Sequence, residues 1–317
     1  MEDKVYDVVI IGGGPSGLTA AIYTTRRSLK TLVISKDIGG QLSLTDDVEN
    51  YPGFESIEGL TLSQKFQQQA AKTGAEFLFE EVVNIEKANG NGFLVKTVSG
   101  KEIKAKSLIL GFGLTPRNLE VPGEKELTGK GVSYCATCDG PLYRGKTTIV
   151  VGGGNAALDA AEYLSKVAKQ VYLIHRRDEF RGEKVLVDQV KAAENVKIIY
   201  NSNTVEIKGT DRVEGLVYKT NDGQEHELQA EGVFVEIGHI AKTAWLEGLI
   251  DINERKEIMI SADCETSQPG IFAAGDVTQI TYKQAVISAG EGAKAGLQAY
   301  KYLQGDKPLT PDWTPKK

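Results

Sequence analysis

The sequence predicts an α/β fold with two doubly wound domains, each binding a nucleotide. Two observations lead to this prediction. Near the start of the chain a short apolar run precedes a glycine-rich turn and a helical segment, and the same order recurs near its middle. Buried parallel strands have such apolar runs, and a glycine-rich turn between strand and helix is where a pyrophosphate binds. Two copies in this context therefore indicate two nucleotides, whereas a single copy would be compatible with an ordinary glycine-rich turn.

The first copy begins with a strand expected over residues 5–11, and a helix is expected over 18–27. Between them, Gly12 allows the tight turn, Gly14 leaves room for the pyrophosphate and Gly17 lets helix and strand pack closely. The helix start attracts the anion through its N–H groups and partial positive charge. The candidate residues of this turn are Gly12, Gly14, Ser16 and Gly17. The next strand ends in Ser35-Lys36-Asp37, where Asp37 is a candidate partner for a ribose hydroxyl, although it comes slightly late.

The second copy consists of a strand expected over 147–151, a turn and a helix expected over 158–169. The candidate residues of its turn are Gly152, Gly154, Asn155 and Ala157. The following strand ends in a basic cluster made of His175, Arg176, Arg177 and Arg181. Guanidinium groups hold a phosphate dianion through paired hydrogen bonds, so the cluster favours NADPH over NADH. The alternative is a solvated basic cluster that binds no ligand.

Other segments complete the expected fold. A third glycine-rich segment, residues 270–276, ends a strand before a final helix rich in small residues. Turn signals at Asn89-Gly90, Asn91-Gly92 and Asn221-Asp222-Gly223 predict two hairpins. The proline- and charge-rich residues 307–317 are expected to form a surface appendage.

Composition excludes several classes of function. The chain of 317 residues is 41% hydrophobic and 25% charged, with a net charge of −6, which is typical of a globular protein. No basic block of the kind that binds nucleic acid is present, and no apolar run is long enough to span a membrane. The amino terminus lacks a secretory signal pattern, so the cytoplasm is expected.

Three cysteines are too few for a disulfide framework, and two of them form the C-x-x-C pair Cys135 and Cys138. A disulfide accepts two electrons as a unit, which matches a flavin that receives hydride from a nicotinamide. Asp139 could give or take the proton of the thiol chemistry. A zinc site would need two more ligands, and only Cys264 and three histidines remain. An inert pair is the other alternative.

The order of these motifs resembles the low-molecular-weight thioredoxin reductases over nearly the whole chain. The matching segments are residues 12–17, Gly39-Gly40-Gln41-Leu42, 135–140, 152–157, 175–181 and Gly275-Asp276-Val277. The resemblance implies two Rossmann-like domains, with an NADPH domain at 118–243 inserted into a discontinuous FAD domain at 1–117 and 244–317. It also implies a homodimer that reduces thioredoxin.

The resemblance further assigns roles to single residues. It places FAD on Gly12, Gly14, Gly17, Gly39, Gly40, Gln41, Asn50, Asp276, Gln284 and Ala285. Cys138 would face the flavin, Cys135 would attack the partner disulfide, and Asp139 would be the acid/base. One domain would rotate about joints at 114–119 and 240–245. Departures from the family pattern occur at residues 111–113, 141–142 and 240–243.

Two alternatives to a thioredoxin reductase remain at this point. One is a related flavin disulfide reductase with a different protein partner or electron donor, although the intact basic cluster argues against another donor. The other is a redox-sensing or nucleotide-binding protein without turnover. Such a protein would leave thioredoxin oxidised in the presence of NADPH.

Overall fold

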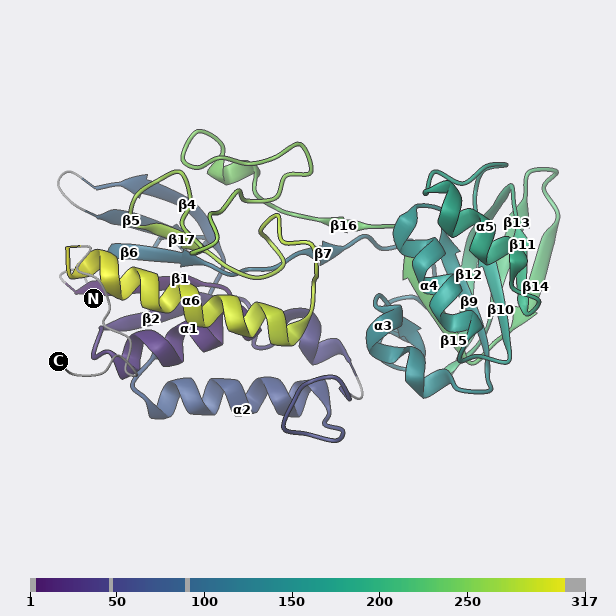
Figure 1. Cartoon of the computed structure of the whole chain (residues 1–317), viewed down its shortest axis with the longest axis horizontal. Helices are drawn as coiled ribbons and strands as arrows, with labels where there is room; N and C mark the ends of the chain where they lie inside the picture. The colour runs from purple at the N-terminus through teal and green to yellow at the C-terminus, as the bar shows by residue number, and fades with distance from the viewer. Residues whose placement is uncertain (1–3, 46–47, 89–91, 306–317) are drawn as a thin grey trace, which may run out of the picture. The chain divides into compact units, whose positions relative to one another are not determined.

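The computed structural model describes residues 4–45, 48–88 and 92–305 (Figure 1). The chain divides into two compact units. The first unit comprises Met1–Ser43, Gly59–Thr115 and Ala241–Lys317, and the second comprises Leu44–Glu58 and Pro116–Ile240. The boundaries expected after residues 117 and 243 lie two and three residues later along the chain. Among the described residues, none of the helices combines the length and the apolar character that crossing a membrane requires.

The first unit is built on a seven-stranded sheet with the order β3-β2-β1-β6-β5-β4, and β17 also pairs with β6. Strands β1, β2, β3, β6 and β17 pair in parallel, whereas β4, β5 and β6 pair antiparallel. The strands are β1 Val5–Ile11, β2 Thr31–Ser35, β3 Glu76–Phe79, β4 Val82–Lys87, β5 Phe93–Thr97, β6 Glu102–Leu110 and β17 Ile271–Ala273.

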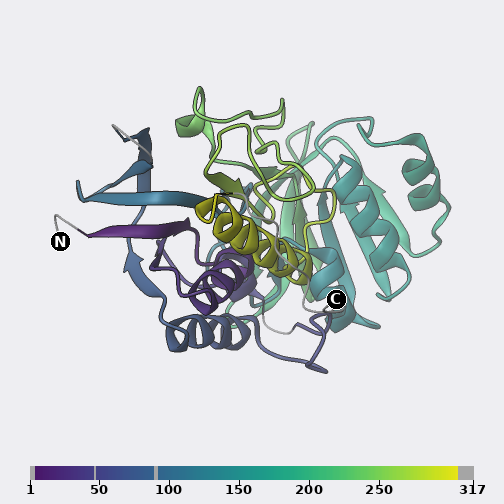
Figure 2. The same cartoon turned by 60° about the vertical axis from the view of Figure 1, so that its left-hand side comes forward.

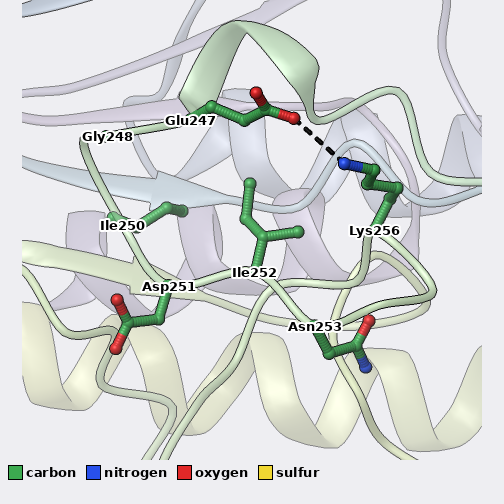
Figure 3. A pocket seen from close by; sticks show the side chains of 7 residues that line it. All are labelled: Glu247, Gly248, Ile250, Asp251, Ile252, Asn253 and Lys256. Carbon is green, nitrogen blue, oxygen red and sulfur yellow. Dashed lines mark hydrogen bonds and ion pairs between the residues drawn. The ribbon is translucent and has the colours of Figure 1, made fainter.

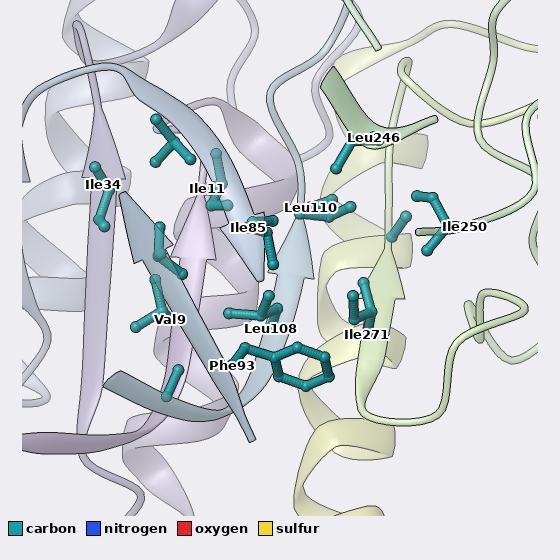
Figure 4. Packing of buried hydrophobic residues seen from close by; sticks show 14 of the residues in the cluster. Val9, Ile11, Ile34, Ile85, Phe93, Leu108, Leu110, Leu246, Ile250 and Ile271 are labelled. Atoms are coloured by element: carbon teal, nitrogen blue, oxygen red, sulfur yellow. The ribbon is translucent and has the colours of Figure 1, made fainter. Parts of the chain in front are cut away.

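Both faces of this sheet are covered, which explains why β1 reads as a continuous apolar run. Val8 and Ile10 pack among residues of the helices on one face. Val9 and Ile11 pack on the other face with Leu246, which belongs to the short helix η3 Ala244–Leu246 (Figure 4). The helices of the unit are α1 Pro15–Arg26, η1 Gly40–Leu44, α2 Gly59–Lys72 and α6 Ala285–Leu303.

Helix α6 lies directly against α1 in both views of the molecule (Figures 1 and 2). The two helices are in tight contact at Gly292, where an added Cβ would lie 2.0 Å from the carbonyl oxygen of Ser16. We expect Gly292→Ala to lower the free energy of unfolding by about 1–3 kcal/mol, because the helices must separate. Chemical denaturation measures this change.

The matched control for that substitution is Gly290→Ala in the same helix. Gly290 is exposed, and an added Cβ there would meet nothing within 4 Å. Alanine is the better helix former at such a position, so this variant should gain about 0.5–1 kcal/mol. Equal effects of the two substitutions would contradict the tight helix contact.

The second unit contains a parallel sheet with the order β11-β10-β9-β15-β8. Its strands are β8 Val132–Ser133, β9 Thr147–Gly152, β10 Gln170–Ile174, β11 Val196–Ile199 and β15 Gly232–Glu236. Its helices are α3 Ala136–Asp139, η2 Gly140–Tyr143, α4 Asn155–Ser165 and α5 Lys184–Ala192. The predicted α/β fold is confirmed in both units.

A separate antiparallel sheet, β12-β13-β14, completes this unit. Its strands are Ser202–Gly209, Val213–Thr220 and Glu225–Gln229. The predicted hairpin turn at residues 221–223 joins β13 to β14 and is confirmed. Strands β4 and β5 also pair antiparallel, but residues 89–91 of their connection, like the predicted appendage at 307–317, lie outside the described residues. The chain passes between the units through β7 Thr115–Pro116 and β16 His239–Ile240, which pair with each other.

Candidate active site

The glycine turn of the first unit has the geometry expected of a pyrophosphate site. Gly12 has a φ of +116°, and an added Cβ would lie 2.3 Å from the carbonyl oxygen of Gly111. At Gly17 an added Cβ would lie 2.0 Å from the Gly12 oxygen. By contrast, a Cβ added at Gly14, the N-cap of α1, would meet only the Gly39 oxygen, at 3.8 Å. The turn is therefore closed toward the protein and open at the helix start, where N–H groups have no partner within the helix.

The end of β2 supports this turn through a residue that the sequence did not single out. The Ser35 hydroxyl accepts a hydrogen bond from the Gly13 N–H at 2.9 Å. Asp37, the predicted ribose partner, is exposed two residues later, and its backbone oxygen would lie 2.6 Å from a Cβ at Gly13. A serine at the end of the second strand was the signal available for Ser35.

The Gly-Gly-Gln segment follows the same edge of the sheet. Gly39 has a φ of +99° and Gly40 a φ of +55°, both in the left-handed region that favours glycine. The side-chain amide of Gln41 donates to the Leu114 carbonyl at 2.8 Å and so ties η1 to the segment that follows β6. Asn50 belongs to the segment that groups with the second unit.

Three distant segments of the first unit meet at Ser16. Its hydroxyl donates to the Gly111 carbonyl at 3.3 Å. A Cβ added at either Gly111 or Gly275 would lie 2.9 Å from the Ser16 Oγ atom. The glycine at position 111, one of the departures from the family pattern, therefore leaves room for the Ser16 hydroxyl.

Asp276 is held by the first turns of α6. The Ser288 hydroxyl donates to its Oδ1 atom at 2.9 Å, and the Gly275 N–H donates to Glu291 at 3.1 Å. Neither Ser288 nor Glu291 was predicted; their spacing of three residues, which places both on one helix face, was the available signal. The other two predicted residues here start the helix, Gln284 as its N-cap and Ala285 as its first residue.

The second glycine turn repeats the design of the first. Gly152 has a φ of +156°, and an added Cβ would lie 2.6 Å from the Ala157 Cβ, so strand and helix are in close contact. Gly154 is the N-cap of α4, and an added Cβ there would meet nothing within 4 Å. The Asn155 side chain accepts from the Glu183 N–H at 2.8 Å and fixes the chain that leads into α5.

His175 lies beneath this turn and is only 7% exposed. Its ring would lie 2.1 Å from a Cβ at Gly153, and its Nε2 atom is 2.9 Å from the Glu179 carbonyl oxygen. Burial, more than the neighbouring arginines, lowers the pKa of His175 below its ordinary value. The imidazole therefore supports the turn as a packed, neutral ring at neutral pH.

The three predicted arginines lie around the carboxyl end of β10. Arg176, Arg177 and Arg181 are all exposed. The backbone N–H of Arg181 donates to the Gly153 carbonyl at 2.9 Å, which joins the basic cluster to the glycine turn. The structure thus brings the predicted turn and the predicted cluster together within one unit.

Cys135 and Cys138 form a disulfide, with their Cα atoms 5.3 Å apart. Cys135 is the N-cap of α3, and its N–H donates to the Ser133 hydroxyl at 3.1 Å. Asp139 ends the same short helix, and its N–H donates to the Cys135 carbonyl at 3.1 Å. Within the described residues no cluster of three or more His, Cys, Asp or Glu could hold a metal ion. The remaining thiol, Cys264, is buried, and burial raises its pKa to about 11.

Glu236 is a further residue of this site that the sequence did not indicate. It ends β15, is only 8% exposed, and its Oε1 atom accepts a hydrogen bond from the Ala136 N–H at 3.2 Å. The pKa of the Glu236 carboxyl is raised to about 8, mainly by burial and to a smaller extent by the charge of Asp159, against the opposing effect of the Ala136 bond. A proton-binding carboxyl therefore lies beside the peptide that follows Cys135.

The raised pKa predicts a pH-dependent stability. The folded protein keeps the Glu236 proton up to about pH 8, whereas the unfolded chain releases it near 4.5. Between these values the folded state binds more protons, so stability falls as pH rises. From pH 6 to pH 8 the loss should be about 2 kcal/mol in the wild type relative to Glu236→Gln. Urea denaturation at both pH values measures it, and parallel curves for the two proteins would contradict it.

A shallow depression in the first unit lies apart from these residues (Figure 3). Its volume is about 410 Å³. Glu247 and Lys256 form an ion pair of 3.1 Å across it, and its lining is mostly the polar loop between them. None of the predicted site residues lines it.

Comparisons with known proteins agree with this arrangement. The sequence pattern of the pyridine nucleotide-disulphide oxidoreductases matches residues 6–292. A thioredoxin reductase of Bacillus subtilis is 41% identical over 306 residues, which cover 96% of each chain. One component of the alkyl hydroperoxide reductase of Escherichia coli is 40% identical over 308 residues, and the match spans 94% of this chain and 58% of that component.

Solved structures give the same result. The crystal structure of thioredoxin reductase from Streptococcus pyogenes superimposes with a TM-score of 0.90 at 38% identity, covering 95% of this chain and 99% of the other. Thioredoxin reductase from Giardia duodenalis gives a TM-score of 0.88 at 38% identity, covering 95% and 100%. With its two glycine turns and its dithiol, the chain belongs to the pyridine nucleotide-disulphide oxidoreductase family, in the group of the low-molecular-weight thioredoxin reductases.

Proposed function

We propose that this chain is an NADPH-dependent thioredoxin-disulfide reductase that carries FAD. The observation that carries the proposal is the Cys135–Cys138 disulfide in a unit that also holds a nucleotide turn bordered by exposed arginines. In this function the bound FAD and NADPH supply a two-electron path from the nicotinamide to the disulfide. The chain's own residues bind both nucleotides, hold the sulfurs and move protons.

The first unit fits FAD. The open space at Gly14 and the start of α1 suit the pyrophosphate, and exposed Asp37 suits a ribose hydroxyl. Asp276, fixed by the Ser288 hydroxyl, suits the polyol chain of the flavin. The remaining proposed contacts are Gly12, Ser16, Gly17, Gly39, Gly40, Gln41, Asn50, Gln284 and Ala285. The FAD domain comprises residues 1–117 and 244–317 in this proposal.

The second unit fits NADPH. The space at Gly154 and the start of α4 suit the pyrophosphate, with Gly152, Asn155 and Ala157 shaping the turn. The guanidiniums of Arg176, Arg177 and Arg181 suit the 2′-phosphate. His175 helps to hold that phosphate by fixing the chain from which the arginines project. The NADPH domain comprises residues 118–243 in this proposal.

The dithiol then reduces the protein partner. Once the disulfide has taken up two electrons, the Cys135 thiolate attacks the partner disulfide, forms a mixed disulfide and expels the partner's thiolate. The Cys138 thiolate next attacks Cys135, releases the second partner thiolate and restores the intramolecular disulfide. Asp139 supplies and removes the protons of these steps. The partner in this proposal is thioredoxin, and the enzyme is a cytoplasmic homodimer.

A coupled assay tests the function. NADPH oxidation by the purified, FAD-loaded protein should depend on added thioredoxin disulfide and should produce thioredoxin dithiol. If NADPH is consumed only with a different disulfide protein, the related function applies, and the similarity to a component of alkyl hydroperoxide reductase makes it the second candidate. If no disulfide protein supports turnover, both candidates are wrong.

A further inference from the structure

The backbone between the two cysteines is held by a carboxyl group from another part of the second unit. Ala136 is the first residue of α3, and the opening N–H groups of a helix have no partner within it. The Glu236 Oε1 atom accepts one of them, at 3.2 Å from the Ala136 nitrogen. The Ala136 nitrogen forms the peptide bond with Cys135, so the carboxyl is hydrogen-bonded to the peptide group that directly follows the first cysteine.

We propose that Glu236 is a positioning residue of the dithiol, whose buried carboxyl fixes the first turn of α3 and whose charge controls thiolate formation by the reduced cysteines. The inference rests on the proposed function for its significance, but it concerns a property of the cysteine pair alone. Glu236 reaches the Ala136 N–H because β15 runs parallel to β8, with Phe234 opposite Ser133, and both chains continue in the same direction from there. The carboxyl end of that strand thus lies beside the start of α3.

The groups around Glu236 determine its protonation. From α4, the charge of Asp159 raises the pKa of Glu236, and from β9 the paired residue is the neutral Gly152. From α3 comes the Ala136 N–H, which directly follows the N-cap residue Cys135. Burial raises the pKa of Glu236 to about 8, close to that of an ordinary thiol. Carboxyl and thiol therefore titrate in the same pH range, and because the carboxyl is held at the peptide that follows Cys135, the proposal makes their ionisations coupled.

The coupling has a definite sign. Chemical reduction adds two electrons and two protons to the disulfide and yields two thiols, each of which can release a proton to solvent. A thiolate forms readily beside a protonated Glu236, but an ionised Glu236 repels it. As pH rises, loss of the Glu236 proton therefore competes with loss of the thiol proton. In the wild type, the titration of the thiol should therefore spread over a wider pH range than the titration of a single uncoupled group.

The test is the pH profile of alkylation of the chemically reduced protein by iodoacetamide, with the modified cysteine identified by mass spectrometry. Glu236→Gln keeps an oxygen that accepts from Ala136 but has no charge. We expect its profile to follow a single ionisation with a midpoint about one pH unit below that of the wild type. Coincident profiles of wild type and Glu236→Gln would overturn the proposal.

Two further variants separate the effect of the Glu236 charge from the effect of its hydrogen bond to the Ala136 N–H. Glu231 immediately precedes β15, is exposed and accepts the Thr147 N–H at 2.8 Å, so Glu231→Gln makes the same change away from the cysteines. Its profile should equal that of the wild type; a shift equal to that of Glu236→Gln would overturn the proposal. Glu236→Ala removes both the charge and the acceptor, and should lower the midpoint as Glu236→Gln does while also lowering stability.

A measurement without any substitution covers the case in which a variant does not fold. In NMR spectra of the wild type, the Glu236 carboxyl should titrate at higher pH after reduction than before it, because the thiolate opposes its ionisation. An unchanged titration would overturn the proposal. None of these experiments uses NADPH or thioredoxin, so their failure leaves the reductase function untouched, and failure of turnover leaves the carboxyl–thiol coupling measurable.

Discussion

Cys138→Ser should lower the rate of NADPH-dependent disulfide reduction by at least about 10³-fold, because the substitution removes the disulfide that receives the electrons. Reduction of the bound flavin by NADPH should survive, since the nucleotide turns are untouched. The two rates are measured separately, one as thioredoxin reduction at steady state and the other as bleaching of the flavin in a single turnover.

The control for this variant is Cys264→Ser. Cys264 is the third cysteine, fully buried, and its Sγ atom donates to the Glu291 carbonyl at 3.6 Å. A serine hydroxyl can donate to the same oxygen, so activity should remain near that of the wild type. Retention of disulfide reduction by Cys138→Ser would refute the dithiol mechanism.

Replacing Arg176 and Arg177 by glutamine should raise the Michaelis constant for NADPH by about 10–100-fold for each residue, the effect of losing a charge-assisted hydrogen bond to phosphate. The Michaelis constant for NADH should barely change, because NADH lacks the 2′-phosphate. Steady-state kinetics with both nucleotides measure the effect as a ratio, which cancels general losses of activity.

Arg212→Gln is the matched control. Arg212 is exposed in the same unit but lies in the turn that joins β12 to β13. Its loss removes the same charge from the unit away from the basic cluster, so the ratio of the two Michaelis constants should not change. Equal changes for NADPH and NADH in the Arg176 and Arg177 variants would disprove the phosphate assignment.

Local patterns in the chain were sufficient to predict the parts of the structure that depend on neighbouring residues. Gly12 and Gly152 each follow an apolar strand and precede a helix, and their positive φ angles confirm the two turns. The helix expected to begin at Leu18 starts at Pro15, because proline is accommodated in the first turn. The disulfide joins Cys135 and Cys138, which are only three residues apart in the sequence.

What could not be predicted depends on contacts between distant residues. Glu236 lies 100 positions from Ala136, and the pairing of β15 with β8 brings the two together. Nothing in the local sequence distinguishes it from a solvated glutamate. In the same way, the burial of His175 could not be predicted. In the sequence it is one of several adjacent basic residues, but in the fold its ring packs closely against Gly153.

The most direct test of the account is an anaerobic titration of the FAD-loaded wild type and Cys138→Ser with NADPH, followed through the flavin spectrum. The wild type should take up one equivalent of NADPH per chain more than the variant, because its disulfide stores a second electron pair. Thioredoxin disulfide should then restore the oxidised spectrum of the wild type alone. Equal uptake by the two proteins would contradict electron transfer to the Cys135–Cys138 disulfide.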